Sequence, residues 1–486
     1  MSPPNILVIC SDQHHPHMSG YRGHARVQTP NLDRLAAQGT HFTRAYCTSP
    51  ICTPSRMSFI TGKYVHQIDN WAIGVPLDPA EMTWARRLDR AGIPSTMLGK
   101  MDFCGDYQDG GFTHHRILRR RGARKEYPMK SPFPPRRPGY RRPDKRVHVR
   151  EAGTRTEQVI SDGGFVGEVD DRVGNYDHDR IVTDWSVEYL RQRGRAKSDR
   201  PWALYVGLLQ PHWPFRVPEK YYNLYYPDNL ELPFDSRFPN PDLHPAVRNQ
   251  QDAQDLGEVT EEMLRKVVAA YCGMVTCVDS MIGEILGELE AQDLADQTCV
   301  IYTSDHGESL GEHGLFYKEC NYEGSVGVPL IVKGPQLPAG GRIDRPVTLV
   351  DLYPTVLDIA GLESEPDRPG HSWLPLIRGQ MQDRPDYAFS EFHADFFRHD
   401  WYMLVRGDYK YTWYAKARPS LFNVTDDPRE MQDLAGDPRH AHVLAEFEAL
   451  LRTILNPEEV SNRAKRDLGL IDPDGTDYTE IPASGV

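Results

Sequence analysis

The chain has 486 residues, which is enough for two or more domains with a large core, and its composition is ordinary for a globular protein. Its formal net charge of −13 argues against general affinity for nucleic acid. The eight cysteines are scattered and never form Cys-x-x-Cys, which disfavours a zinc site, a redox pair or a disulfide framework.

The first residues predict a cytoplasmic protein. Met-Ser-Pro-Pro at 1–4 leads directly into an apolar run, without the charged region, hydrophobic region and cleavage site of a secretory signal. A leader preceding this sequence would change that expectation. No uninterrupted apolar run reaches the ~18 residues that a membrane helix needs, so no membrane contact is expected.

Four apolar segments of strand type end in polar residues that can carry chemistry. The segments and the residues that follow them are 5–10 with Asp12, 94–98 with Lys100, 202–209 with His212, and 298–303 with Asp305 and His306. Apolar runs that alternate with helical stretches indicate an α/β fold, in which ligands bind at the carboxyl ends of the strands. One such residue alone would more often form a turn or cap a helix. Four together favour a shared site.

Helical patterns occupy the stretches 29–39, 263–289 and 349–361, and the pattern changes beyond about residue 380. There, 401–405 and 409–414 flank a short Gly-containing turn and predict a β-hairpin. A strand at 420–424 and a helix at 441–455 follow. We therefore expect a catalytic domain over 1–380 and a smaller α+β domain, with an antiparallel sheet and a helix, over 381–486.

The segment 116–155 breaks the acidic average because it is rich in arginine and proline. Two interpretations remain open. The segment is either a solvated loop or subunit contact, or a lid that attracts anionic substrates by its charge. A homo-oligomer is expected.

The stretch Cys52-Thr53-Pro54-Ser55-Arg56 lies between a loop and a helix-like run at 57–62. With Pro54 at the first helical position, the thiol of Cys52 would face unpaired N–H groups and the positive end of the helix dipole. That environment suits a nucleophile or an anion. The alternative is a buried free cysteine, with Arg56 on a solvated helix face.

Cys-x-Pro-x-Arg is also the modification signature of the type I sulfatases, in which the cysteine is oxidised to formylglycine. With its other motifs, the chain resembles the sulfatase branch of the alkaline-phosphatase superfamily over most of its length. The motifs occur in the family's order at 5–12, 29–35, 49–56, 99–100, 211–212, 304–308, 318, 328–330 and 421–423. Residues 99–103 and 390–393 further resemble the choline-sulfatase and arylsulfatase K-like groups, the latter of which act on sulfated uronic acids.

The resemblance implies a large mixed sheet flanked by helices, as in alkaline phosphatase, and one divalent metal. Its protein ligands would be Asp12, Gln13, Asp305 and His306, together with a hydroxyl of the oxidised and hydrated Cys52. Oxygen-rich ligands favour Ca²⁺, with Mg²⁺ and Mn²⁺ as alternatives.

The resemblance also implies a mechanism. A formylglycine-generating enzyme would oxidise Cys52, and the hydrated aldehyde would attack sulfur to form a covalent intermediate. The leaving alcohol would take a proton from His212 or Lys318. Arg56 and Lys100 would offset charge on the sulfuryl oxygens.

Two residues depart from the family's pattern. Gln13 stands where many sulfatases have a second Asp, which lowers the charge of the ligand set. Asp102 stands where many have a His, and it either acts as a base or contacts substrate. His66 and His393 are further candidates for substrate contacts, although His66 also fits an ordinary helix-end histidine.

The sequence therefore predicts a sulfuric ester hydrolase that cleaves an organic sulfate monoester, such as a sulfated sugar or uronate. The alternative is a phosphonate monoester or phosphodiester hydrolase, because those relatives share Cys-x-Pro-x-Arg and the Asp-Gln pair. A non-catalytic anion-binding protein would have lost the nucleophile, the Arg or the Lys, and all three are present.

Overall fold

The computed structural model describes residues 3–117, 119–120, 153–155, 168–169, 174–227, 230–237, 240, 242–254, 259–380, 384–393 and 399–471. The predicted basic segment 116–155 lies almost wholly outside the described residues, so both interpretations of it stay predictions.

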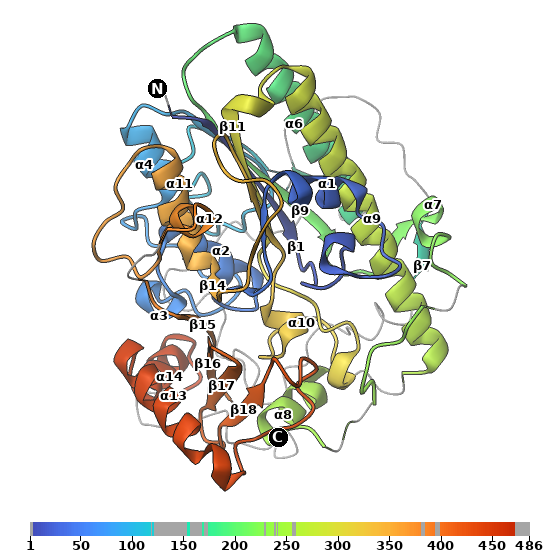
Figure 1. The fold of residues 1–486 in the computed structure, drawn as a ribbon, viewed down its shortest axis with the longest axis vertical. Coiled ribbons are helices and arrows are strands. Elements are labelled where there is room, and N and C mark those ends of the chain that lie inside the picture. The colour runs from blue at the N-terminus through green and yellow to red at the C-terminus, as the bar shows by residue number, and fades with distance from the viewer. Residues whose placement is uncertain are drawn as a thin grey trace.

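A mixed eight-stranded sheet forms the centre of the molecule (Figure 1). In spatial order it comprises β13 (Gly341–Ile343), β2 (Thr40–Phe42), β12 (Leu330–Lys333), β11 (Thr298–Ser304), β1 (Asn5–Asp12), β9 (Ala203–Pro211), β4 (Ser95–Gly99) and β5 (His114–Arg116). The strands from β11 to β5 are parallel, whereas β12 pairs antiparallel with β11 and with β2. The carboxyl ends of β11, β1, β9 and β4 therefore meet at one edge.

Strand β1 is buried along its whole length, which is typical of a parallel strand covered on both faces. Its Ile6 and Val8 pack into one layer of the core, and Leu7 and Ile9 pack into the other. The first layer includes α2 (Cys52–Thr61), α4 (Trp84–Arg90) and α11 (Leu352–Ile359), and the second includes α1 (Pro30–Gln38), α6 (Asn175–Ala196) and α9 (Glu261–Ala291) (Figure 1). The predicted α/β architecture is confirmed.

Helix α9 is, among the described residues, the one helix long and apolar enough to cross a membrane by length and composition. Its most apolar window of 18 residues is 78% buried inside the protein. Such burial is what a core helix shows, and α9 packs against α6 and β9.

A second, antiparallel sheet lies in the C-terminal part of the chain, at the bottom of Figure 1. Its strands are β15 (Tyr387–Phe392), β16 (Trp401–Arg406), β17 (Tyr409–Tyr414) and β18 (Ser420–Asn423), and α13 (Ala441–Ile454) and α14 (Pro457–Asp467) follow. The predicted hairpin is the β16–β17 pair, in which Arg406 lies opposite Tyr409. The expected smaller antiparallel sheet with a helix is thus present, and the boundary at residue 380 stays a prediction.

The described residues include further strands and α-helices outside the two large sheets and the helices named above. They are β3 (Ala45–Tyr46), α3 (Val65–Ile68), β6 (Arg119–Arg120), β7 (Gly153–Arg155), β8 (Glu168–Val169), β10 (Arg216–Pro218), α7 (Glu219–Tyr222), α8 (Pro245–Gln254), α10 (Glu323–Val326), β14 (Val347–Thr348) and α12 (Leu374–Ile377).

Contacts between the two sheets reach segments that carry candidate site residues. The Glu391 amide donates to the Thr48 carbonyl at 2.9 Å, four residues before Cys52. The Trp401 indole donates to the Glu319 carbonyl at 3.1 Å, next to Lys318. The C-terminal sheet therefore supports the segments that carry Cys52 and Lys318.

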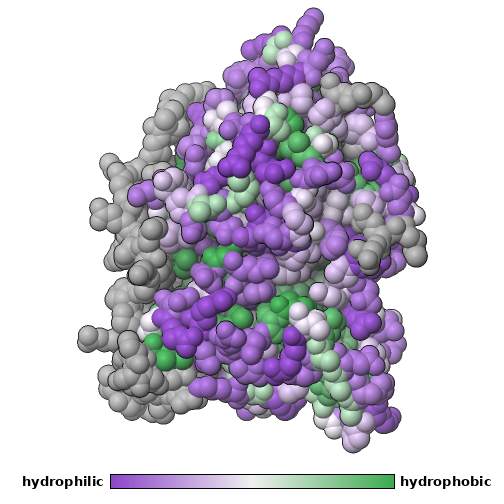
Figure 2. Space-filling model, turned by 90° about the vertical axis from the view of Figure 1, so that its left-hand side faces the viewer, coloured by the Kyte–Doolittle hydropathy of each residue, from purple (hydrophilic) through white to green (hydrophobic). Residues whose placement is uncertain are grey.

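The face drawn in Figure 2 is mainly hydrophilic, with apolar side chains in small separate groups. The large apolar side chains that are exposed among the described residues are Ile73, Tyr107, Leu224 and Met431. Single exposed apolar residues are normal for a globular protein.

Candidate active site

Four neighbouring strands deliver chemically useful side chains to the same edge of the sheet. Asp12 ends β1, and Asp305 and His306 follow its neighbour β11. On the other side of β1, His212 follows β9 and Lys100 follows β4. The structure thus brings together all the strand-end residues that the sequence pattern singled out.

Helix α2 brings Cys52 to this edge. The helix begins at Cys52, with Ile51 in extended conformation before it, so Pro54 is the third helical residue. The expectation that Pro54 opens the helix was therefore wrong by two positions. A proline fits anywhere in the first turn, because the N–H that it lacks would have no helical partner there. The Ser55 hydroxyl donates to the Asp305 carbonyl at 2.6 Å and fixes α2 against the end of β11.

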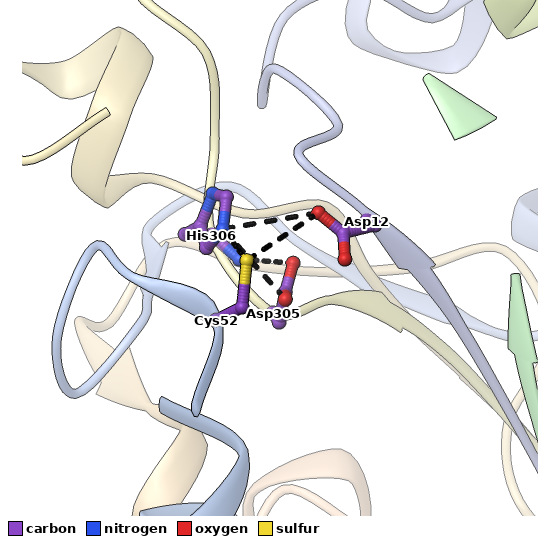
Figure 3. A group of neighbouring side chains, drawn as sticks. All are labelled: Asp12, Cys52, Asp305 and His306. Carbon is purple, nitrogen blue, oxygen red and sulfur yellow. Dashed lines mark hydrogen bonds and ion pairs between the residues drawn. The ribbon is translucent and has the colours of Figure 1, made fainter. Parts of the chain in front are cut away.

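Asp12, Cys52, Asp305 and His306 are buried and each offers a ligand atom, all within 4.8 Å of one another (Figure 3). The His306 Nε2 atom lies 3.3 Å from Cys52 Sγ and 3.9 Å from an Asp12 carboxylate oxygen. The His306 Nδ1 atom lies 3.0 Å from the Gly307 carbonyl, to which it donates. The lone pair of Nε2 is therefore directed at the cluster. Burial lowers the pKa of His306 to about 4, which keeps the imidazole neutral.

Gln13 borders this cluster in a left-handed backbone conformation, with φ of 65°. Its amide N–H donates to Asp305 Oδ1 at 3.1 Å, and its side-chain oxygen accepts from Lys318 Nζ at 2.7 Å. Its side-chain nitrogen donates to Glu308. The oxygen is the atom that faces Lys318, and the predicted role of Gln13 as a ligand stays a prediction.

Cationic side chains surround the two carboxylates. Arg56 is fully buried and donates to Asp305 Oδ2 at 2.9 Å and to Asp12 Oδ2 at 3.1 Å. Lys100 Nζ lies 2.5 Å from Asp12 Oδ2. Burial alone would raise the pKa of Asp12, but the positive charges beside it, Lys100 foremost, hold it well below its usual value. The Asp12 carboxylate is thus available as an anionic ligand.

Lys318 lies beside the thiol and a histidine. Its Nζ atom is 3.5 Å from Cys52 Sγ and 2.8 Å from His212 Nε2. The His212 Nδ1 atom lies 2.6 Å from the Trp213 carbonyl and donates to it, so Nε2 accepts from Lys318. Burial, and then the charge of Lys318, lower the pKa of His212 well below its usual value. The pair can hold a proton next to Cys52.

The backbone on both sides of Lys318 is left-handed. Tyr317 has φ of 68° and Glu319 has φ of 85°, in a region that non-glycine residues seldom adopt. Each such residue costs on the order of 1–3 kcal/mol and persists only where its surroundings hold it. Strain of this kind, next to a predicted catalytic lysine, indicates that the position of Lys318 is imposed by its neighbours.

The thiol of Cys52 is itself a poor nucleophile. Burial, and then the charge of Asp12, raise its pKa to about 12. The thiolate is the reactive form of cysteine, and at neutral pH this thiol is protonated. Asp12 opposes a thiolate at this position, whereas the positive charges of Lys100 and Lys318 partly offset that effect.

Asp102 lies outside the cluster and reaches it through Lys100, whose Nζ is 3.3 Å from Asp102 Oδ2. Its side chain is 28% exposed, and its φ of 61° is again left-handed. Both interpretations of Asp102, as a base and as a substrate contact, stay open.

His66 and His393 both contact Glu391, a residue to which the sequence interpretation gave no role. Each lies 2.9 Å from the carboxylate of Glu391, with one histidine on each oxygen. The His393 side chain is fully buried and packs edge-on against Trp71, with ring centroids 4.5 Å apart. The pKa of Glu391, which burial would raise, is held low by His66 and His393. Glu391 stands in the same Ser-Glu-Phe-His motif, and the role of both histidines toward a substrate stays a prediction.

The fold and the site together define an α/β enzyme of the alkaline-phosphatase-like class, with a buried centre made of two carboxylates, a histidine and a cysteine. The family model described as sulfatase matches residues 4–362, and the one described as N-sulphoglucosamine sulphohydrolase, C-terminal, matches residues 311–456. The chain belongs to the sulfatase family, as the motifs predicted, and is a sulfuric ester hydrolase.

Individual relatives agree with this assignment. Arylsulfatase K of Danio rerio is 31% identical over 484 residues, which covers 95% of this chain and 86% of the relative. Choline-sulfatase of Rhizobium meliloti is 29% identical over 447 residues, which covers 90% of this chain and 83% of the relative. The predicted nearness to both groups is confirmed.

Solved structures share the fold over almost the full length. The phosphonate monoester hydrolase of Agrobacterium radiobacter has a TM-score of 0.73 at 24% identity, and covers 97% of this chain and 99% of its own. BT4656, solved with D-glucosamine-2-N,6-O-disulfate, has a TM-score of 0.75 at 22% identity, with the same coverage. At these identities the likeness shows the fold alone.

Proposed function

We propose that the chain hydrolyses a sulfate monoester with a nucleophile made from Cys52 by oxidation to formylglycine. A divalent cation would be held by Asp12, Gln13, Asp305 and His306. The observation that supports the proposal most directly is the position of Cys52. Its thiol has a raised pKa and lies at a helix N-terminus, within 4.8 Å of three side chains that could bind a cation.

The donor set suits a hard cation. Carboxylate oxygens, an amide oxygen and one neutral imidazole are ligands that Ca²⁺, Mg²⁺ and Mn²⁺ accept, and Ca²⁺ is the first choice. When bound, the cation would acidify the hydroxyl of the hydrated aldehyde and polarise the sulfuryl group.

The chain's own residues account for the other requirements of the reaction. Lys100 and Lys318 supply positive charge where the sulfuryl oxygens would lie. Lys318 and His212, in contact at 2.8 Å, hold a proton for the leaving alcohol. Arg56 donates hydrogen bonds to Asp12 and Asp305, and these bonds keep the two carboxylates in one orientation.

The substrate class and the partners belong to the same proposal. The likeness to arylsulfatase K supports a sulfated sugar or uronate as the natural substrate. Oxidation of Cys52 requires a formylglycine-generating enzyme during maturation. A homo-oligomer remains part of the proposal.

The preference for sulfate can be tested with three substrates that release the same leaving group. We expect kcat/KM to be highest for the aryl sulfate and lower for phenyl phosphonate monoesters and phosphodiesters. Steady-state rates on one purified sample, with aldehyde content measured by intact mass, make the comparison. A faster rate on the phosphonate would favour the alternative hydrolase.

Removal of the cation is expected to inactivate the enzyme reversibly. Because a bound cation supplies several kcal/mol of transition-state stabilisation, exhaustive chelation should lower kcat by about 10³-fold or more. Added Ca²⁺ should restore the rate and also raise the melting temperature, since a ligand of the folded state stabilises it. Full activity and an unchanged melting temperature after chelation would contradict a bound cation.

A further inference from the structure

We propose that Gln250 and Gln254 of α8 are positioning residues that hold Lys318 against His212 and the side chain of residue 52. The inference rests on the proposed function, in which Lys318 and His212 hold the proton for the leaving alcohol. It adds residues that lie outside every motif and that do not themselves face the cluster.

Helix α8 carries three buried glutamines, Gln250, Gln251 and Gln254, which are 4%, 6% and 4% exposed. A buried amide needs hydrogen-bond partners, and each of these finds them on the main chain of residues 314–318. Gln250 Nε2 donates to the Lys318 carbonyl at 2.8 Å, Gln251 Nε2 donates to the Gly314 carbonyl at 2.6 Å, and Gln254 Nε2 donates to the Phe316 carbonyl at 2.6 Å. The Gln254 side-chain oxygen also accepts from the Phe316 amide at 3.1 Å. The side-chain amides of α8 thus bind the main chain of this segment.

The segment needs this support because its left-handed residues prevent regular pairing. The Tyr317 amide donates to a Glu308 carboxylate oxygen at 2.5 Å, and the Tyr317 carbonyl accepts from Ser309 at 2.6 Å. The Glu319 amide donates to the Pro50 carbonyl at 3.1 Å. These contacts hold the peptides on either side, whereas the contact to the Lys318 carbonyl comes from Gln250.

The position of Lys318 matters because proton transfer requires hydrogen-bond reach. Its Nζ atom lies 2.8 Å from His212 Nε2 and 3.5 Å from Cys52 Sγ, so a shift of the main chain would break the first contact. A displacement of about 1 Å at a reacting group can cost on the order of 10²-fold in rate. Loss of the Gln250 amide leaves the Lys318 carbonyl buried without that donor, and the segment must move to satisfy it.

The chain offers a matched control on the same helix. Gln251 is as buried as Gln250 and makes the same type of amide-to-carbonyl bond, but to Gly314, four residues before Lys318. Its oxygen accepts from the Asn240 amide at 2.9 Å. A merely structural role predicts equal effects of the two substitutions, whereas positioning predicts a difference that is specific to proton transfer.

The test compares Gln250→Met, Gln254→Met and Gln251→Met with the wild type, each in the oxidised, metal-loaded full-length enzyme. The probe is a series of substituted phenyl sulfates whose leaving phenols differ in acidity. The slope of log kcat/KM against the pKa of the phenol reports how far the leaving oxygen is protonated in the transition state. Lys318→Ala serves as the reference for a lost proton donor, and melting temperatures record stability.

We expect Gln250→Met to steepen the slope toward that of Lys318→Ala, with losses of about 10- to 100-fold for the least acidic phenol and little loss for the most acidic. Gln254→Met should steepen it less, and Gln251→Met should lower the melting temperature while leaving the slope unchanged. If Gln250→Met does not fold, the comparison of Gln254→Met with Gln251→Met decides.

Equal slopes in all variants, or a uniform loss across the series, would overturn the positioning role. A wild-type enzyme with full aldehyde content and no activity on any phenyl sulfate would overturn the proposed function, and the inference with it. If the wild type is active and the slopes of the variants are unaltered, the positioning role fails while the proposed function stands.

Discussion

Replacing Cys52 with alanine is expected to lower kcat/KM for an aryl sulfate by at least about 10⁴-fold, the scale on which enzymes lose rate when a nucleophile is removed. The physical reason is that the methyl group of alanine cannot be converted into a group that supplies the attacking oxygen. Intact-mass analysis should show the exchange of thiol for aldehyde in the wild type only. Aryl sulfate kinetics on both proteins give the rate ratio.

The control for this experiment is Cys299→Ala, which removes another buried thiol near the opposite end of β11. That variant should keep both the aldehyde and the activity. Retained activity in Cys52→Ala, or activity in a wild-type sample whose mass shows an unmodified thiol, would contradict a nucleophile derived from Cys52.

Asp12→Asn is expected to reduce both cation binding and catalysis. The substitution keeps the shape of the side chain but removes the negative charge that lies 2.5 Å from Lys100 and 3.1 Å from Arg56. We expect the Kd for Ca²⁺ to rise at least about 10-fold and kcat to fall on the order of 10³-fold. Calorimetric titration of the chelated protein with Ca²⁺ measures the first quantity, and steady-state kinetics measure the second.

Asp351 provides the matched control, because it is another buried carboxylate paired with an arginine, at 2.6 Å from Arg384. Asp351→Asn should lower the free energy of unfolding, since breaking a buried pair costs about 3–5 kcal/mol, without changing the Kd for Ca²⁺. If Asp12→Asn binds Ca²⁺ as tightly as the wild type, Asp12 is not a ligand of the cation.

The central part of the site was predictable because its residues end or closely follow apolar strands. Asp12, Lys100, His212 and Asp305 each lie at the end of a segment whose pattern is plain, and parallel strands bring such ends together. The antiparallel strands β2 and β12 were not predicted from the sequence, because they have only three and four residues. So short a run shows no periodicity that separates it from a loop.

What the sequence could not show are the residues that act through tertiary contact. Arg56 was expected to offset charge on the sulfuryl oxygens, whereas in the structure its donors bind Asp12, Asp305, the Lys100 carbonyl and the Tyr205 hydroxyl. The contact of Gln250 with Lys318 and that of Glu391 with His66 are equally hidden in the sequence, because the partners lie 68 and 325 residues apart. Such roles depend on which surfaces pack together, and no local pattern encodes them.

The burial of Cys52 also limits the period in which another enzyme could reach its thiol. The residue is only 3% exposed in the finished fold, and the histidine against its sulfur lies 254 residues further along the chain. At ribosomal speeds of about 5–20 residues per second, that histidine is synthesised roughly 10–50 s after Cys52. The modifying enzyme of the proposed function would reach the thiol while the chain is growing and would lose access once the sheet is formed. On that proposal, the yield of active protein would depend on whether oxidation of Cys52 precedes folding.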